Sequence, residues 1–232
     1  MDLTHSVALV TGANRGLGRA FAAALLARGA GKVYAAARDP STIDLPGVVP
    51  VRLDVTNAAD VAAAARSLVD VNLLINNAGI IERTTLLGGD LTALRREMET
   101  NFFGTLAMSQ AFAPVLAANG GGALVNVLSV LSWVTVPGAA MYSASKAAAW
   151  ALTNALRQEL AAQNTLVTAL HVGYMDTDMA AHVQMPKANP ADVANQVLDA
   201  VRDGREEVLA DELSRQVKAG LAADPGVYLG RR

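Results

Sequence analysis

The 232-residue sequence contains no cysteine. This absence excludes a disulfide-bonded scaffold, a cysteine-ligated zinc site and a thiol nucleophile. The chain also lacks a run of the roughly 20 apolar residues that a membrane-spanning helix needs, because arginine, aspartate or asparagine interrupts each apolar stretch. No positively charged segment precedes an apolar run near Met1, so the sequence predicts a cytoplasmic protein without a secretory signal.

Charge of one sign is scarce as well. Nineteen lysine and arginine residues stand against 21 aspartate and glutamate residues, which gives a formal net charge of -2. Such a chain has no basic field for nucleic acid and no polybasic stripe for an anionic membrane. With 52% hydrophobic and 17% charged residues, its composition is that of a folded globular protein. We therefore expect a small-molecule partner.

Apolar runs alternate with alanine-rich helical patterns along the chain. The predicted strands are 6–11, 32–37, 48–53, 71–75, 123–128, 166–171 and a short one at 208–209. The predicted helices are 17–28, 60–69, 91–118 with a break near Asn101 and Gly104, 141–162, and one that begins at Pro190. Strands that are apolar throughout are typical of a parallel sheet covered on both faces by helices. The sequence thus predicts an α/β fold: one doubly wound, Rossmann-like domain over residues 1–232, with about seven strands.

A glycine-rich turn joins the first predicted strand to the first helix. It reads Thr11-Gly12-Ala13-Asn14-Arg15-Gly16-Leu17-Gly18. Glycines let the chain turn tightly and let its backbone approach a pyrophosphate, whose charge the helix N-terminus attracts. An ordinary turn between a strand and a helix is the alternative interpretation of these glycines alone.

Tyr142 and Lys146 stand four residues apart on the predicted helix 141–162, so their side chains should share one face. A nearby ammonium favours the phenolate, so we expect the pKa of Tyr142 to lie below the ordinary tyrosine value of about 10. Such a tyrosine can act as a general acid and base. Because the same spacing often occurs on helix surfaces by coincidence, the pair needs support from its neighbours.

Three motifs in this order resemble the short-chain dehydrogenase/reductase family in its compact single-domain form. They are the Gly-x-x-x-Gly-x-Gly turn, Asn76-Asn77-Ala78-Gly79 and Tyr142-Ser143-Ala144-Ser145-Lys146, and the resemblance extends from Val7 to roughly Met179. The glycine spacing differs from the Gly-x-Gly-x-x-Gly of the better-known dinucleotide fingerprint. The resemblance implies hydride transfer between a nicotinamide and a carbonyl or alcohol carbon, with Tyr142 as the general acid/base.

The resemblance also implies a catalytic set of Asn101, Ser129, Tyr142 and Lys146. Ser129 lies 13 residues before Tyr142 and corresponds to the serine that orients the substrate oxygen by a hydrogen bond, with Ser132 as second candidate. Asn101 corresponds to the family residue that holds a water between the lysine and solvent. A polar residue inside a helix that bonds the backbone is the alternative for Asn101.

NADP(H) is the predicted cofactor. An NAD site usually carries an acidic residue at the end of the second strand, where this chain has Ala37. Arg38 comes next, and Arg15 lies in the glycine turn, so two guanidinium groups could bind a 2′-phosphate. Two solvated arginines, with Asp39 as a displaced ribose ligand, are the alternative. The resemblance assigns these residues to the cofactor: Gly12, Asn14, Arg15, Gly16, Leu17, Gly18, Arg38, Asp54, Val55, Asn77, Ala78, Gly79, Tyr142, Lys146, Gly173, Met175 and Thr177.

The chain departs from the family after the sixth predicted strand. It reads His171-Val172-Gly173 where the family usually has Pro-Gly, so the backbone path towards the nicotinamide is in doubt. Neither His171 nor His182 has a partner at metal-ligand spacing, and no Gly-x-Ser-x-Gly elbow surrounds Ser129. We therefore predict neither a metal site nor a hydrolase, and interpret both histidines as structural.

The substrate pocket is predicted to be mostly apolar and to contain no cation, which favours a hydrophobic ketone, aldehyde or secondary alcohol. Its predicted lining is Leu131, Ser132, Trp133, Val134, Tyr174, Met175 and Met179. Two other functions remain open: dehydration or epimerisation on the same fold, and non-catalytic sensing of NADP.

Apolar residues occur on more than one side of helix 141–162: Trp150, Leu152, Leu156 and Leu160. They fit the homodimer or homotetramer interface that the resemblance implies, and they fit equally a helix sunk into its own core.

Overall fold

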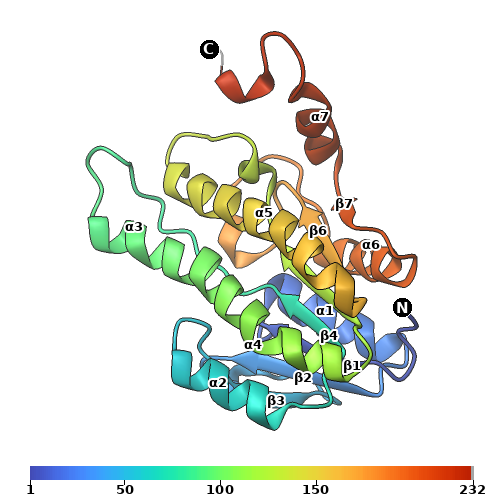
Figure 1. Cartoon of the computed structure of the whole chain (residues 1–232). Helices are drawn as coiled ribbons and strands as arrows, with labels where there is room; N and C mark the ends of the chain where they lie inside the picture. Colours follow the sequence, from blue (N-terminus) through green and yellow to red (C-terminus); the bar gives the residue numbers. More distant parts are fainter. Residues whose placement is uncertain (231–232) are drawn as a thin grey trace.

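Seven parallel strands form one sheet in the computed structural model, which describes residues 1–230 (Figure 1). They are β1 (Val7–Thr11), β2 (Lys32–Ala37), β3 (Val49–Arg52), β4 (Leu73–Asn76), β5 (Ala123–Val127), β6 (Leu166–His171) and β7 (Glu207–Leu209). Their order across the sheet is β3-β2-β1-β4-β5-β6-β7. The predicted doubly wound, Rossmann-like α/β fold with about seven strands is confirmed.

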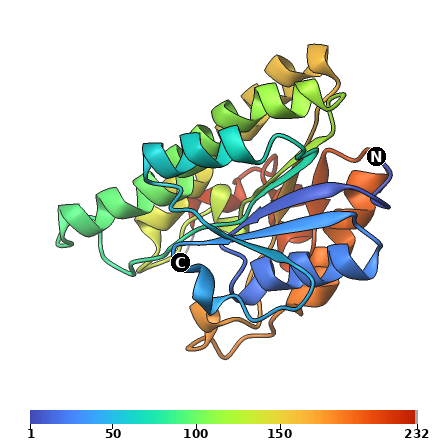
Figure 2. The ribbon, with the colours of Figure 1, turned by 90° about the horizontal axis from the view of Figure 1, so that it is seen from below.

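Helices cover both faces of this sheet (Figure 2). The helices are α1 (Gly16–Ala27), α2 (Ala58–Ser67), α3 (Leu91–Met98), α4 (Thr105–Ala118), α5 (Ala140–Leu160), α6 (Pro190–Arg202) and α7 (Glu212–Gly220). Helices α1 and α6 pack on one face, and α2, α4 and α5 pack on the other. Within residues 1–230, no helix combines the length and the apolar character needed to cross a membrane.

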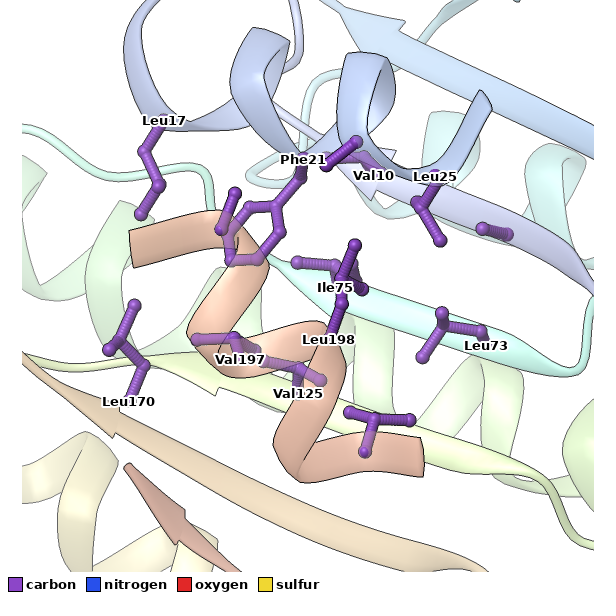
Figure 3. Packing of buried hydrophobic residues seen from close by; sticks show 14 of the residues in the cluster. Val10, Leu17, Phe21, Leu25, Leu73, Ile75, Val125, Leu170, Val197 and Leu198 are labelled. Atoms are coloured by element: carbon purple, nitrogen blue, oxygen red, sulfur yellow. The ribbon is translucent and has the colours of Figure 1, made fainter. Parts of the chain in front are cut away.

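The core between α1, α6 and the sheet supports the glycine turn, which lies at the carboxyl end of β1. Figure 3 shows Phe21 and Leu25 of α1 with Leu198 of α6 near Ile75 of β4, and all four side chains are fully buried. Each such side chain stabilises the fold by about 1.5–3 kcal/mol when it leaves water. Because Phe21 lies only one turn after Gly18, packing of α1 also fixes the turn before it.

The predicted break near Asn101 and Gly104 is a π-helical segment, Glu99–Gly104, which joins α3 to α4 without interruption. A π turn accommodates one additional residue and displaces the side chains around it. Gly104 is needed there, because a Cβ atom at this position would lie 2.7 Å from Cγ2 of Val55. The long helix therefore changes its winding where Asn101 faces the candidate site.

Helix α7 was not predicted from the sequence. Helix α7 has only nine residues, in which Leu213 and Val217 supply a single i, i+4 apolar pair, so its apolar signal is short. Its start is instead defined by Asp211, whose side chain accepts a hydrogen bond from Ser214 N at 2.8 Å. Figure 1 shows α7 and the C-terminal residues extending beyond the end of the sheet.

Candidate active site

Several of the predicted site residues lie in loops at the carboxyl ends of four adjacent strands, whereas Asn101, Tyr142 and Lys146 lie on helices. The glycine turn follows β1, Asn77 follows β4, Ser129 follows β5 and Gly173 follows β6, and these strands are neighbours in that order. The strand order reverses between β1 and β4. In parallel α/β sheets, ligands bind in the crevice at such a reversal point.

Close approach and backbone conformation require glycine at three positions of the turn. Gly12 has a φ of +64° and Gly16 a φ of +52°, a region that L side chains rarely adopt. A Cβ atom at Gly18 would overlap the carbonyl oxygen of Gly12. Asn14 is half-buried in the turn, and Leu17 is buried in the core beneath it.

No side chain caps the N-terminus of α1. Arg15 occupies its N-cap position without a capping hydrogen bond, and the first turn carries no acidic residue. By contrast, Asn57, Asp90, Asn189 and Asp211 cap α2, α3, α6 and α7. The N–H groups of α1 and its positive end thus remain available to an anion. These residues fit the pyrophosphate of a dinucleotide.

Asn77 fastens the loop after β4 to the glycine turn. Its Nδ2 donates to Thr11 O at 2.9 Å and to Gly12 O at 3.2 Å. In return, Thr11 Oγ1 accepts hydrogen bonds from Asn77 N at 2.9 Å and from Ala78 N at 3.0 Å. The two loops therefore form one unit, in which Asn77 has a structural task.

Asn101 is almost fully buried and connects three segments. Its Oδ1 accepts from Ile80 N, and its Nδ2 donates to Ile80 O and to Ser145 Oγ, each at 2.9 Å. The side chain does bond backbone, as the alternative interpretation had it, but the backbone belongs to the loop after Gly79 and not to its own helix. Asn101 thus holds this loop against α5.

Lys146 is buried on α5, and its Nζ donates to Val127 O at 2.8 Å. The same Nζ lies 5.7 Å from the centre of the Tyr142 ring. A Cβ atom on Gly79 would be 3.7 Å from Nζ and 3.2 Å from Oδ1 of Asn101, so these groups meet beside Gly79. Burial lowers the pKa of Lys146 to about 8.

The structure corrects the expected direction of the Tyr142 shift. Burial raises the pKa of Tyr142 to about 12, a hydrogen bond with Ser129 opposes this rise, and the charge of Glu97 adds to it. Burial removes the water that would stabilise the phenolate, and the neighbouring groups do not replace that stabilisation. Lys146 does not supply a reliable positive charge, because its own burial disfavours the charged form. Tyr142 therefore holds its proton at neutral pH in the protein without cofactor.

The two candidate serines have different surroundings. Ser129 precedes the 3-10 turn Val130–Ser132, and its Oγ accepts from Leu131 N at 3.1 Å; the same side chain is near enough to the Tyr142 phenol to lower its pKa. The Oγ of Ser132 instead accepts from Ser129 N at 3.3 Å. The structure thus brings Ser129 next to Tyr142 and uses Ser132 to shape the turn.

At the end of β2, Asp39 makes local hydrogen bonds. Its Oδ1 accepts from Ser41 N at 3.0 Å and from Ser41 Oγ at 2.7 Å, which caps the 3-10 turn Pro40–Thr42. These bonds hold the pKa of Asp39 below its usual range. A carboxylate engaged in this way is a poor candidate for a ribose ligand.

Arg15 and Arg38 are both exposed around the glycine turn. Arg15 Nη1 lies 3.2 Å from Oδ2 of Asp178, in the segment after β6. Partial burial works against ionisation of Asp54, yet hydrogen bonds from Thr56 and the charges of Arg38 and Arg52 hold its pKa below the usual range. The adjacent Val55 is buried.

The segment after β6 returns to the glycine turn. Thr177 packs against Gly16, where an added Cβ atom would lie 3.3 Å from Thr177 Cγ2, and Met175 pairs with Ala188. Val172, which replaces the family's usual proline, is buried, and its carbonyl accepts from Val130 N at 3.0 Å. In residues 1–230, its own N–H donates no hydrogen bond, so this position does not depend on a valine N–H.

Glu97 was missed by the sequence analysis. Its side chain is 2% exposed, its Oε1 accepts from Glu82 N at 2.7 Å, and burial raises its pKa. Together with Asn101, four residues later, it fixes the loop that follows Gly79. The i, i+4 spacing of Glu97 and Asn101 was the available signal, but it does not reveal burial.

The predicted pocket lining needs two corrections. Trp133 is 8% exposed and stacks on the buried His171 with ring centres 3.8 Å apart, so it belongs to the core and not to an open wall. A cation is also present, because Arg83 donates from Nη2 to Met179 O at 2.6 Å and contacts His182 Nε2. Arg83 thereby joins the loop after β4 to the segment after β6.

His171 is fully buried, and its Nδ1 donates to Ser129 O at 3.1 Å. Because a carbonyl can only accept, Nδ1 carries the proton. Nowhere in residues 1–230 do three or more side chains suited to a metal ion come together. His171 thus supports the strand end that carries Ser129.

The apolar residues of α5 are accounted for within the chain. Leu156 and Leu160 belong to the core, Leu152 packs against it, and Trp150 meets Trp133 edge to face at 6.1 Å. They give no independent support to an interface between copies.

Known proteins with similar sequences and folds identify the family of this chain. A family model described as short chain dehydrogenase matches residues 6–188. The chain is 30% identical over 236 residues to a 3-oxoacyl-[acyl-carrier-protein] reductase of Synechocystis sp., covering 96% of this chain and 91% of that protein.

Two solved structures are similar over nearly their full length. A short chain dehydrogenase from Burkholderia cenocepacia J2315 in complex with NADP has a TM-score of 0.93 and 45% identity, covering 97% of this chain and 96% of that one. A short chain dehydrogenase/reductase from Burkholderia phymatum in complex with NAD has a TM-score of 0.88 and 25% identity, covering 100% of this chain and 97% of that one.

Proposed function

Because the chain belongs to the short-chain dehydrogenase/reductase family of oxidoreductases, we propose that it is an NADP(H)-dependent carbonyl reductase or alcohol dehydrogenase with Tyr142 as general acid/base. One observation carries this proposal: Tyr142, Lys146, Ser129 and Asn101 are linked to one another next to Gly79, in the loop that Asn77 ties to the glycine turn. A binding protein that only sensed the nucleotide would not need this set.

In the direction of reduction, Tyr142 gives its proton to the substrate oxygen. NADPH, when bound, would supply the hydride for the carbonyl carbon. A phenol with a pKa of about 12 is fully protonated at neutral pH, so the acid form is always present. Ser129 orients the same oxygen through its hydroxyl, and in the oxidation direction Tyr142 takes the proton back.

Lys146 and Asn101, which both lie next to Gly79, support this proton transfer. With a pKa of about 8, Lys146 can exchange a proton near neutral pH, and it can replenish the proton that Tyr142 has lost. The Asn101 side chain is committed to Ile80 and Ser145. A water that links Lys146 to solvent would therefore be held by a group other than this side chain, and we assign that role to the backbone carbonyl of Asn101.

The preference for NADP(H) rests on Arg15 and Arg38. Both side chains are exposed near the end of β2, where Ala37 offers no carboxylate and Asp39 is engaged with Ser41. The NADP complex of the 45% identical relative supports this assignment. Arg15 would exchange its contact with Asp178 for the 2′-phosphate, a doubly charged acceptor.

For the substrate, we propose a ketone, aldehyde or secondary alcohol with an apolar body. The two segments that Arg83 joins expose large apolar side chains: Leu86, Leu87, Met179 and Met185. The guanidinium of Arg83 adds a cation to this otherwise apolar region. Carbonyl compounds with and without a carboxylate at the far end therefore belong in one test panel.

A spectrophotometric assay of NADPH oxidation across this panel tests the proposed function. We expect stoichiometric conversion of NADPH and ketone, with NADH as the weaker donor. Product formation without net NADPH oxidation would point to dehydration or epimerisation instead. Tight NADPH binding without turnover of any compound would favour the sensing protein.

A further inference from the structure

One carboxylate, that of Asp211, performs two tasks with its two oxygen atoms. Oδ1 accepts from Ser214 N at 2.8 Å and caps α7, and Oδ2 accepts from Gly173 N at 2.7 Å. Asp211 and Gly173 are 38 residues apart in the sequence. The side chain thereby ties the C-terminal helix to the loop that follows β6.

This contact continues the pairing of β6 with β7 beyond the end of the sheet. His171 pairs with Leu209, and Ala210 N donates to His171 O at 3.0 Å. Beyond this pair, the next hydrogen bond between the two segments is the one from Gly173 N to Oδ2 of Asp211. A bond to an ionised acceptor is stronger than one between neutral groups.

The approach of Asp211 to the backbone is unusually close. A Cβ atom on Gly173 would lie 2.9 Å from Oδ2 of Asp211 and 2.9 Å from Cδ2 of Leu213. Because Gly173 does not have a positive φ, its backbone conformation does not call for glycine; a Cβ atom there would instead displace the ends of the Asp211 and Leu213 side chains. Gly173 and Asp211 are therefore linked both by a hydrogen bond and by close contact.

The loop after Gly173 depends on this pair. The preceding residue, Val172, donates no hydrogen bond from its N–H within the described chain, so Gly173 N is the first amide that fixes the loop. Four residues later, Thr177 packs against Gly16 of the glycine turn. A shift at Gly173 would be passed to Met175 and Thr177, the predicted contacts of the nicotinamide.

We propose that Asp211 is a positioning residue for the nicotinamide half of the cofactor, acting through its hydrogen bond to Gly173 N. The role rests on the proposed function, since it presupposes that NADP(H) binds along residues 173–177. The adenine half would bind at the glycine turn and Arg38, and Asp211 makes no hydrogen bond to either, so its binding should not depend on Asp211.

Asp211→Ser separates the two tasks. Serine is a good N-cap residue, so α7 keeps its cap, but its shorter side chain with one oxygen cannot also reach Gly173. Asp90→Ser is the matched control, because Asp90 caps α3 through Thr92 N at 2.9 Å and makes no hydrogen bond to a loop of the site. Asp211→Asn is a second variant of nearly the same shape with one acceptor oxygen fewer.

The first readout uses the protein without cofactor. Hydrogen exchange at the Gly173 amide should be faster in Asp211→Ser and unchanged in Asp90→Ser, with similar melting temperatures for both.

The second readout compares NADPH with 2′,5′-ADP, which lacks the nicotinamide half. Asp211→Ser should bind NADPH roughly tenfold more weakly and 2′,5′-ADP as tightly as the parent protein. Asp211→Asn should follow in the same direction. Adding Val172→Pro, which sacrifices no hydrogen bond and stiffens the start of the loop, should restore part of the NADPH affinity.

Equal NADPH affinity in Asp211→Ser and the parent protein would overturn the role of Asp211. Equal weakening of NADPH and 2′,5′-ADP would overturn it too, because the effect would then be general. A parent protein that binds neither compound would instead overturn the proposed function.

Discussion

Nζ of Lys146 lies 5.7 Å from the centre of the Tyr142 ring, and burial shifts the pKa of each group towards its neutral form. The pKa of Tyr142 rises to about 12, and that of Lys146 falls to about 8. If the phenolate and the ammonium were both charged, their attraction at this distance would not offset the cost of removing two charges from water. The protein without cofactor therefore holds a protonated acid beside a readily deprotonated amine.

Replacing Tyr142 with phenylalanine should remove the proton donor and leave the shape of the site. We expect kcat to fall by roughly 10²–10⁴-fold, with NADPH affinity largely retained. The measurement is steady-state turnover together with a fluorescence titration of NADPH. Tyr174→Phe, a change of the same chemistry in the segment after β6, should have a much smaller effect; substantial turnover in Tyr142→Phe would contradict the assignment.

Replacing both Arg15 and Arg38 with alanine should weaken NADPH much more than NADH. Loss of two charge-assisted contacts to the 2′-phosphate predicts an effect of roughly 10²-fold on the NADPH dissociation constant. Arg19→Ala is the control, because this exposed arginine of α1 pairs with Asp44. An unchanged ratio of the two affinities would exclude the arginines as selectors.

Lys146 should make stability depend on pH above 8. Its folded-state pKa is about 8 against 10.5 for the ordinary group, so between these values the unfolded chain binds the extra proton. Raising the pH through this window therefore favours the folded state, by a total of about 3 kcal/mol. Urea unfolding at several pH values should show this rise in the parent protein and not in Lys146→Met. Parallel profiles would mean that Lys146 is better solvated than its burial indicates.

His171 should destabilise the protein in acid. Burial lowers its pKa to about 4 from 6.5, so the unfolded chain takes up the proton first as the pH falls. Stability is then lost between pH 6.5 and 4, by about 3 kcal/mol in total. His171→Asn retains a donor for Ser129 O and should flatten the profile in that window, whereas His182→Asn, at an exposed position, should not. Thermal unfolding across this pH range measures the difference.

The homo-oligomer that the family resemblance implies remains a prediction. The residues of α5 that stay exposed include Ala144, Ala151 and Ala155, whose small side chains would allow close approach of a second copy. Light scattering should give a mass of at least two chains for the parent protein. Ala151→Arg should reduce that mass without lowering the melting temperature of the monomer. A monomeric parent protein would rule the assembly out.

Short-range patterns predicted most of the fold. Unbroken apolar runs identified the strands, since a strand covered on both faces has no polar side. The glycine turn could be assigned because its requirements are local, as the positive φ of Gly12 and Gly16 shows. Helix α7 was missed because it has only nine residues, and its single apolar pair, Leu213 and Val217, is a short signal.

The sequence by itself determined which residues stand at the carboxyl ends of the strands and that Tyr142 and Lys146 share a helix face, because both follow from residue order and backbone periodicity. Tertiary structure alone decided three further matters: the direction in which the pKa of Tyr142 shifts, the hydrogen bond from Arg83 to Met179 O, and the hydrogen bond from Gly173 N to Asp211. Each depends on what surrounds a group in space. Burial and contacts between distant segments arise only when the sheet and its helices pack, and no local spacing encodes them.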